Sequence, residues 1–288
     1  MRSETEMMNL ILDYARNDER IRAATIEGSR MNKNAPQDQF QDYDVSYIVN
    51  DIESFKKDDA WLDYFGPRLI MQKPEAMALF PPELGNRFSY LMLYDDENRI
   101  DLTLVPITDL PEHFNETDSL TKVVLDKDGI CPKLEPPSDK DYLVKKPSAE
   151  FVDDCCNEFW WLSSYVTKGL CRNEILYAIK YLDLMRNQMF NMISWKVGIE
   201  TNFSVSVGKA NKYLQKYVSE ELWQNILKTY SNDTSENVWR AMIISCNIFM
   251  DATDFVCKKL NYSIPVYSVN MLKYIKKYAE LESVEREE

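Results

Sequence analysis

The chain has 288 residues, 45% of them hydrophobic, which is enough for an ordered core and for two domains of ordinary size. Its formal net charge of −13 disfavours binding to nucleic acid and favours a small cationic partner. No apolar run reaches the ~20 residues of a membrane span, and the N-terminal residues lack a signal-peptide pattern, so we expect a cytoplasmic protein with no membrane partner.

The first half of the chain carries helix and strand patterns in turn. Ser3 and Glu6 form a capping box before apolar residues at helical spacing, which predicts a helix to about residue 17. The acidic stretch 95–97 predicts the solvated turn of a β-hairpin. Other apolar and alternating runs predict strands at 21–27, 42–50, 69–72, 88–94 and 99–107, a loop at 31–41 and a helix at 52–65. We therefore expect a mixed β-sheet flanked by helices.

The composition changes near residue 130. Residues 131–147 are rich in proline, lysine and aspartate and show little periodicity, which is typical of a linker. Beyond it the pattern is helical throughout, and we expect helices at 151–170, 174–195, 209–217, 220–230, 235–259 and 268–281. The sequence therefore predicts an α+β domain over residues 1–130 and an all-α helical bundle domain over residues 148–288.

Two short motifs in the first half carry chemistry. Gly28 and Ser29 end the first strand, where a glycine lets backbone N–H groups approach a phosphate and a serine hydroxyl adds a hydrogen bond. Asp42 and Asp44 open the second strand two residues apart, so their side chains share a face. Neighbouring carboxylates repel each other unless a cation lies between them, and oxygen ligands of this kind suit Mg²⁺. We therefore expect a phosphate site and a metal site close together.

A third carboxylate lies on a later strand. Ile100, Leu102 and Leu104 alternate along one face of that strand, and Asp101 lies on the other face. Three carboxylates on adjacent strands beside a Gly-Ser turn indicate a site for two-metal nucleotidyl transfer. Gly-Ser alone and Asp-x-Asp alone are weak signals, whereas the ordered set is specific.

In this order the motifs resemble those of the polymerase-beta-like nucleotidyltransferases. The sequence stretches around these motifs resemble those of one branch, the aminoglycoside 6-adenylyltransferases, also called streptomycin adenylyltransferases. The resemblance covers nearly the whole chain. The matching stretches are Glu27-Gly28-Ser29-Arg30, Gln41-Asp42-Tyr43-Asp44-Val45-Ser46-Tyr47, Ile70-Met71-Gln72-Lys73-Pro74-Glu75, Arg99-Ile100-Asp101-Leu102-Thr103-Leu104-Val105-Pro106 and Asp154-Cys155-Cys156-Asn157-Glu158-Phe159-Trp160-Trp161.

The resemblance implies an antibiotic-resistance enzyme that transfers AMP from Mg²⁺-bound ATP to a hydroxyl of an aminoglycoside and releases pyrophosphate. Streptomycin and its 6-hydroxyl are the implied acceptor. Residues 1–130 would form the catalytic nucleotidyltransferase domain, and the helical domain would close over the nucleotide. We expect the enzyme to act as a monomer.

The same resemblance assigns roles to the motif residues. Asp42 and Asp44 would hold Mg²⁺ on the triphosphate, and Asp101 would bind a second ion or take the proton of the attacking hydroxyl. Gly28 and Ser29 would cradle the β and γ phosphates. For Arg30 two alternatives stay open: the side chain adds positive charge to the phosphate site, or it faces solvent.

The helical half adds further candidates. Gly208-Lys209 precedes a predicted helix, and a helix N-terminus with a lysine suits a triphosphate, although a plain helix start explains it equally well. Lys168 and Arg172 are alternatives for the same role. Glu158 and Trp161 could present an acidic and aromatic face to a guanidinium or ammonium group, the alternative being that the tryptophans at 160 and 161 serve as interdomain core.

Two other functions stay open: the same chemistry on a different aminoglycoside or a lincosamide, and a non-catalytic nucleotide-binding regulatory module on the same fold. A non-catalytic member would be expected to lose a carboxylate, and all three are present. His113, the only histidine, lies in a stretch that predicts a surface loop, and no CxxC pair exists, so we expect no structural zinc site. The six cysteines, two adjacent at 155 and 156, are expected to be reduced and buried.

Overall fold

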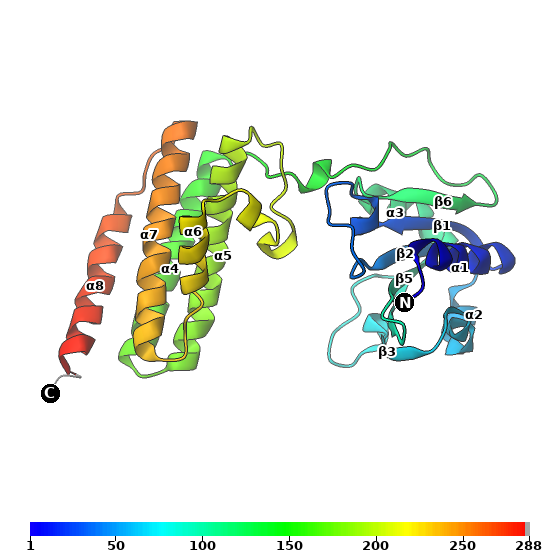
Figure 1. The fold of residues 1–288 in the computed structure, drawn as a ribbon, viewed down its shortest axis with the longest axis horizontal. Coiled ribbons are helices and arrows are strands. Elements are labelled where there is room, and N and C mark those ends of the chain that lie inside the picture. The colour runs from blue at the N-terminus through cyan, green and yellow to red at the C-terminus, as the bar shows by residue number, and fades with distance from the viewer. Residues whose placement is uncertain (286–288) are drawn as a thin grey trace. The chain divides into compact units, whose positions relative to one another are not determined.

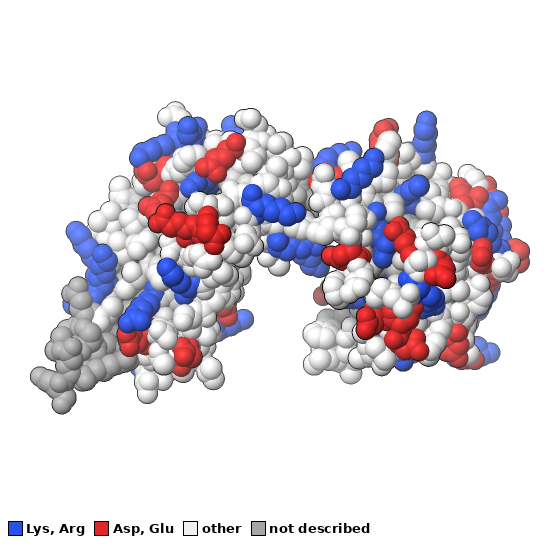
Figure 2. Space-filling view, in the orientation of Figure 1, with Lys and Arg blue, Asp and Glu red and all other residues white. Residues whose placement is uncertain are grey.

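The computed structural model describes residues 1–285, which divide into two compact units. The N-terminal unit comprises Met1–Asp141, and the helical unit begins at Tyr142 (Figure 1). Among the described residues, no helix is both long enough and apolar enough to span a membrane. On the face drawn in Figure 2, acidic and basic side chains are interspersed over both units.

The N-terminal unit is built on a six-stranded mixed sheet with the strand order β3-β4-β5-β2-β1-β6 (Figure 1). Strands β2 and β5 run parallel at its centre, and the other neighbouring pairs are antiparallel. The mixed sheet and the β4–β5 hairpin confirm the predictions, whereas β6 is a strand that the sequence patterns missed. The strands are β1 (Ile21–Glu27), β2 (Tyr43–Val49), β3 (Arg68–Gln72), β4 (Phe88–Tyr94), β5 (Arg99–Pro106) and β6 (Lys122–Asp126).

One face of this sheet packs into the main hydrophobic core of the N-terminal unit. Side chains such as Ile26, Val45 and Leu102 pack there against Met7 and Ile11 of α1 (Glu4–Asn17). The helix begins at the predicted capping box, in which the Ser3 hydroxyl accepts from the Glu6 N–H and the Glu6 carboxylate accepts from the Ser3 N–H. Burial of the apolar stripe of α1 therefore fixes one side of the sheet.

The opposite face changes character along the strands. At one end Ala23, Ile48 and Val105 form a small apolar cluster with Leu110 of α3 (Leu110–Glu116). The next row across the sheet is Thr25, Ser46, Thr103 and Ser89, which carry hydroxyl groups. The row after that carries carboxylates and is described below. This face thus passes from apolar to hydroxylated to acidic as it approaches the site.

Two predictions for the N-terminal unit are wrong. The predicted helix over 52–65 is broken: α2 (Ile52–Lys56) is followed by a 3₁₀ segment, Asp59–Phe65, because the Asp58 side chain caps a new turn at the Ala60 N–H. The turn at 95–97 is not wholly solvated either. Asp96 is mostly buried and accepts from the backbone N–H and the guanidinium of Arg2, at 3.0 and 2.6 Å. It anchors the N-terminus to the β4–β5 hairpin.

The second unit is an all-α bundle, as predicted. Helices α4, α5 and α7 run side by side, with α8 along one side of them (Figure 1). Phe159 of α4 and Phe249 of α7 stack at the centre with ring centroids 3.7 Å apart. The six cysteines are free, and the prediction of burial holds for the four at 155, 156, 246 and 257 but not for the exposed Cys171 or the half-buried Cys131. The helices are α4 (Ala149–Cys171), α5 (Ile175–Glu200), α6 (Glu220–Lys228), α7 (Ser235–Leu260) and α8 (Tyr267–Glu285).

The prediction of a helix over 209–217 is wrong. That stretch holds two short 3₁₀ segments, Lys209–Asn211 and Leu214–Lys216. Ala210 has a φ of 54° and Asn211 a φ of 61°, so the backbone cannot continue as a right-handed helix. The apolar residues of this stretch, such as Leu214, are buried individually and do not form the continuous apolar face of a helix.

Candidate active site

A row of three carboxylates crosses the centre of the sheet. Asp44 on β2 lies directly opposite Asp101 on the parallel strand β5, and directly opposite Glu27 on the antiparallel strand β1. Residues opposite each other in a sheet project to the same face, so these side chains lie side by side. Asp42 immediately precedes β2, one residue outside the strand that was predicted to include it. The sheet register thus brings Asp44 and Asp101 together, as predicted, and adds Glu27.

Asp44 has the most perturbed environment of the row. Its carboxylate accepts no hydrogen bond from any described residue, and burial raises its pKa from 3.8 to about 7. The charges of Asp101, Asp42 and Glu27 add to the increase, and Arg99 opposes it. A half-buried carboxylate that lacks a donor and faces three other acids is suited to a cation, which would satisfy its oxygens and its charge together.

Gly28 packs its backbone against that carboxylate. Its φ is +71°, and a Cβ built at this position would lie 3.2 Å from Cγ of Asp44 and in direct clash with Oδ2. Glycine is therefore required twice, for the backbone conformation and for the close approach. The turn Gly28–Met31 places Ser29 next, where its hydroxyl makes no hydrogen bond to the rest of the described chain. The predicted phosphate turn and the predicted metal ligand are thus in contact.

Arg99 neutralises part of the acidic row. Its guanidinium donates two hydrogen bonds to Asp101, at 2.8 and 2.6 Å, and lies 3.6 Å from Asp42. Within residues 1–285, no three metal-ligating side chains are grouped closely enough to hold an ion as they stand. The carboxylate oxygens of the row fit Mg²⁺ as ligands. To bind the ion, however, Asp101 would have to give up its hydrogen bonds to the Arg99 guanidinium.

Arg30 is neither a solvent-facing side chain nor directed at the row. Its side chain is 8% exposed, lies 3.5 Å above the ring of Tyr43, and donates to the carbonyl oxygens of Gln41 and Asp42 at 2.7 and 2.9 Å. The solvent-facing alternative for Arg30 is therefore wrong. Its contacts fix the backbone that delivers Asp42 to the start of β2.

A basic pocket opens beside the Gly28–Met31 turn. It has a volume of about 640 Å³ and is lined by Lys33, Lys122 and Lys133, with Arg30 and prolines of the segment after β6. In the described part of the chain these three lysines form no ion pair with a carboxylate. Unpaired lysines are notable in a protein with a net charge of −13, and they provide an environment for an anion next to the turn.

The predicted candidates in the helical unit lie on two segments, Glu158 and Trp161 one turn apart on α4 and Lys209 in the stretch before α6. Lys209 does not begin a helix, so the helix-terminus argument for it is wrong. Glu158 and Trp161 are exposed on α4, and the Trp161 indole N–H donates to the Tyr165 hydroxyl at 3.1 Å. Trp160 is 2% exposed and packs in the helical unit's own core, so it is a core residue of that unit rather than the interdomain core residue of the alternative.

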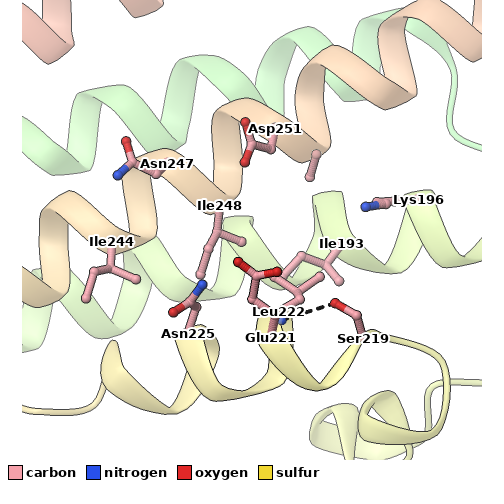
Figure 3. Close-up of a pocket in the computed structure, with 11 residues that line it drawn as sticks. Ile193, Lys196, Ser219, Glu221, Leu222, Asn225, Ile244, Asn247, Ile248 and Asp251 are labelled. Atoms are coloured by element: carbon pink, nitrogen blue, oxygen red, sulfur yellow. Dashed lines mark hydrogen bonds between the residues drawn. The ribbon is translucent and has the colours of Figure 1, made fainter.

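A separate polar pocket of about 420 Å³ lies between α5, α6 and α7. Figure 3 shows the carboxylates of Glu221 and Asp251 directed toward its open space, with Asn225 and Asn247 nearby and Lys196 at one end. Glu158 and Trp161 do not line it. Its carboxylates and amides could contact a cationic polar molecule, which makes Glu221 a comparison residue for Glu158.

Sequence reasoning missed Glu27, Arg99 and the environment of His113. The prediction that His113 lies in a surface loop is wrong: it lies on α3, is 6% exposed, and its Nε2 is 3.8 Å from Oε1 of Glu27. The available signal was the position of Glu27 immediately before the Gly-Ser turn. The apolar helix residues around His113 were too few to indicate α3.

The comparisons with known proteins show the family to which this chain belongs. A family model described as streptomycin adenylyltransferase matches residues 1–278. Three proteins named aminoglycoside 6-adenylyltransferase are 47% identical (Bacillus subtilis strain 168), 45% identical (Campylobacter jejuni) and 37% identical (Staphylococcus aureus), each over 95–96% of this chain and 95–98% of their own length. A crystal structure of an aminoglycoside 6-adenyltransferase from Bacillus subtilis matches with 42% identity, over 96% of this chain and 99% of its own, at a TM-score of 0.48. The chain belongs to the streptomycin adenylyltransferase family, whose members are nucleotide-transferring enzymes.

Proposed function

We propose that this enzyme transfers AMP from Mg²⁺-bound ATP to a hydroxyl group of an aminoglycoside, with streptomycin and its 6-hydroxyl as the acceptor, and releases pyrophosphate. The observation that carries the proposal is the row of Asp44 and Asp101 on adjacent parallel strands beside the Gly28 turn. Relatives that share 37–47% identity carry the name aminoglycoside 6-adenylyltransferase, which supports the acceptor class.

Each residue of the row has a distinct task in this reaction. Asp42 and Asp44 would hold the ion that accompanies the triphosphate, and Mg²⁺ when bound supplies positive charge to the phosphate oxygens. Asp101 comes from a separate strand and would serve the acceptor side, where its carboxylate takes the hydroxyl proton or ligates a second ion. The hydroxyl oxygen attacks the α-phosphorus and pyrophosphate leaves with the bridging oxygen, so no covalent enzyme intermediate is needed.

The phosphates would extend from the turn into the basic pocket. Gly28 presents its backbone without a side chain, and the Ser29 hydroxyl is unengaged in the described chain. Lys33 and Lys133 would then face the β and γ phosphates and the departing pyrophosphate. Lys209 is not needed for this role.

The acceptor would be bound largely by charge. Each carboxylate–guanidinium hydrogen bond in a partly buried contact contributes on the order of 1.5–3 kcal/mol, and exposed pairs contribute less and are screened by salt. Glu158 and Trp161 remain the proposed contacts on α4, since both side chains are exposed. In the described chain, the Glu158 carboxylate forms no ion pair.

The direct test is pyrophosphate release from ATP and Mg²⁺ with and without streptomycin, with mass spectrometry of the product. We expect release only with the acceptor and a product heavier by one adenylyl group. Asp44→Asn should abolish transfer, and Asp101→Asn should slow the chemical step by several orders of magnitude while it spares ATP binding more than Asp44→Asn does. Turnover near wild type in either variant would contradict the assignment.

Two other functions give different results in the same assay. An acceptor other than streptomycin would show as adducts with other members of an aminoglycoside and lincosamide panel. A regulatory nucleotide-binding module would bind ATP and release no pyrophosphate with any acceptor. The presence of Asp42, Asp44 and Asp101 together favours the enzyme.

A further inference from the structure

Glu27 is held in an unusual way at the end of β1. Its Oε1 accepts hydrogen bonds from the hydroxyls of Thr25 and Ser46, at 2.7 and 2.9 Å. Its Oε2 accepts none from any residue in the described range. Because Glu27 lies directly opposite Asp44, its carboxylate belongs to the same row, and the unengaged oxygen is left for a partner on that face.

His113 adds an independent observation on the same oxygen. The imidazole is 6% exposed, and its Nε2 lacks a hydrogen-bond partner although it is buried. A neutral imidazole carries one N–H, which it can place on Nε2 to act as a donor there. Nε2 stands 3.8 Å from Oε1 of Glu27, which is too long for a hydrogen bond but is closed by a shift of less than about 1 Å. A buried donor without a partner is costly, so it favours this closure.

Among the described residues, Nε2 of His113 has no hydrogen-bond partner, so no other group competes with Glu27 for it. The charged groups that face it are Glu27, Arg87 and Glu116, and Arg87 and Glu116 already pair with each other at 2.8 Å. A ring nitrogen that can reach a carboxylate oxygen fixes the orientation of that carboxylate, as outer partners do for ligands in metal sites. His113 is therefore placed to fix the orientation of the Glu27 carboxylate.

We propose that Glu27 is a fourth carboxylate of the active site, that it offers Oε2 to the ion held at Asp44, and that His113 is a positioning residue that completes the hydrogen bonding of Oε1. This inference rests on the proposed function. Three donors on one oxygen leave the other oxygen as the ligand and keep it on the acidic face. Glu27 would thereby hold the ion from the side of β1, opposite to Asp101 on β5.

The test measures the affinity of the intact protein for Mn²⁺, used alone as a stand-in for Mg²⁺, by electron paramagnetic resonance of the free ion. Glu27→Gln keeps the size and hydrogen bonds of the side chain and should weaken Mn²⁺ binding by at least tenfold. His113→Leu should weaken it by about tenfold, whereas His113→Gln, which keeps an N–H donor, should stay within threefold of wild type. Glu112→Gln, at an exposed carboxylate on α3, is the matched control and should leave the affinity unchanged.

A second readout follows from the single histidine. On addition of Mg²⁺, the ¹⁵N resonance of Nε2 should shift in the wild type, and this shift should be absent in Glu27→Gln. The same spectrum shows whether Glu27→Gln and Asp44→Asn are folded, because the buried ring has a dispersed signal only in the native protein, and circular dichroism shows it for the two His113 variants, which have no histidine.

The outcomes separate this inference from the proposed function. If Asp44→Asn binds Mn²⁺ as well as wild type does, the ion does not lie at the row and the proposed function fails. If Asp44→Asn loses Mn²⁺ but Glu27→Gln remains within twofold of wild type, the row holds the ion and Glu27 is not a ligand. If Glu27→Gln loses affinity but His113→Leu does not, the positioning role of His113 is wrong.

Discussion

Asp44→Asn should stabilise the metal-free protein, although it destroys the proposed activity. The pKa of Asp44 is about 7 in the folded protein against an ordinary value of 3.8. Each tenfold change in proton affinity corresponds to about 1.4 kcal/mol, so the charged carboxylate costs about 4 kcal/mol of folding free energy at full ionisation. Asparagine has nearly the same shape, carries no charge and avoids that cost.

The pH dependence has a definite sign. Below about pH 4 the carboxyl is protonated in both states, and between about pH 4 and 7 only the folded state holds the proton, so wild-type stability falls as the pH rises. Above about pH 7 both states are ionised and the slope from this group vanishes. The advantage of Asp44→Asn should therefore grow from near zero at pH 4 to about 4 kcal/mol at pH 8.

Urea unfolding in EDTA, at several pH values, measures this advantage. The resonance of His113 reports the N-terminal unit alone, since the helical unit has no histidine. Asp96→Asn is a control of opposite sign: hydrogen bonds from Arg2 lower the pKa of Asp96, so its loss should destabilise the protein at pH 8. An Asp44→Asn protein that is less stable than wild type at pH 8, or an advantage that does not vary with pH, would refute the reasoning.

Three further predictions concern the site. Gly28→Ala should abolish transfer and lower the melting temperature, because its Cβ meets the Asp44 carboxylate and its backbone has a positive φ; normal activity would contradict the contact. Arg99→Met should lower the Mg²⁺ concentration for half-maximal rate by up to about fivefold, since an exposed pair with Asp101 is worth at most about 1 kcal/mol; an increase would mean that Arg99 helps to bind the nucleotide. Glu158→Gln should raise the KM for streptomycin at low salt but not at high salt, with Glu221→Gln as its comparison, and equal effects of both variants would remove the special role of Glu158.

The elements that could be predicted from sequence are those with a strong period or a specific cap. The capping box at Ser3 and the alternation around Asp101 both gave elements within one or two residues of their observed bounds. The helix predicted over 52–65 failed because its apolar residues serve two separate turns joined at Asp58. The helix predicted from Lys209 failed because two residues with positive φ interrupt an apolar spacing that looks helical.

For the candidate site, the sequence could indicate the residues but not their neighbours. Asp44 and Asp101 follow from motif order, since each opens a strand with a recognisable pattern. Glu27 enters the row only through the register of β1 with β2, which no local pattern specifies. The role of Arg30 depends on two backbone carbonyls and one ring, and the environment of His113 depends on how α3 covers the sheet.

The parallel pairing of β2 with β5 has a consequence for how the protein acquires its site. β1 with β2 and β4 with β5 are antiparallel pairs of chain neighbours, so each can form through contacts that are close in sequence. The first pair carries Glu27 and Asp44, and the second carries Asp101. Asp101 reaches Glu27 and Asp44 only when the two pairs dock along β2 and β5, which are separated in the chain by the crossover through β3 and β4. The complete row of acids therefore requires that long-range pairing, and a chain in which β2 and β5 have not docked would hold Glu27 and Asp44 together but lack Asp101.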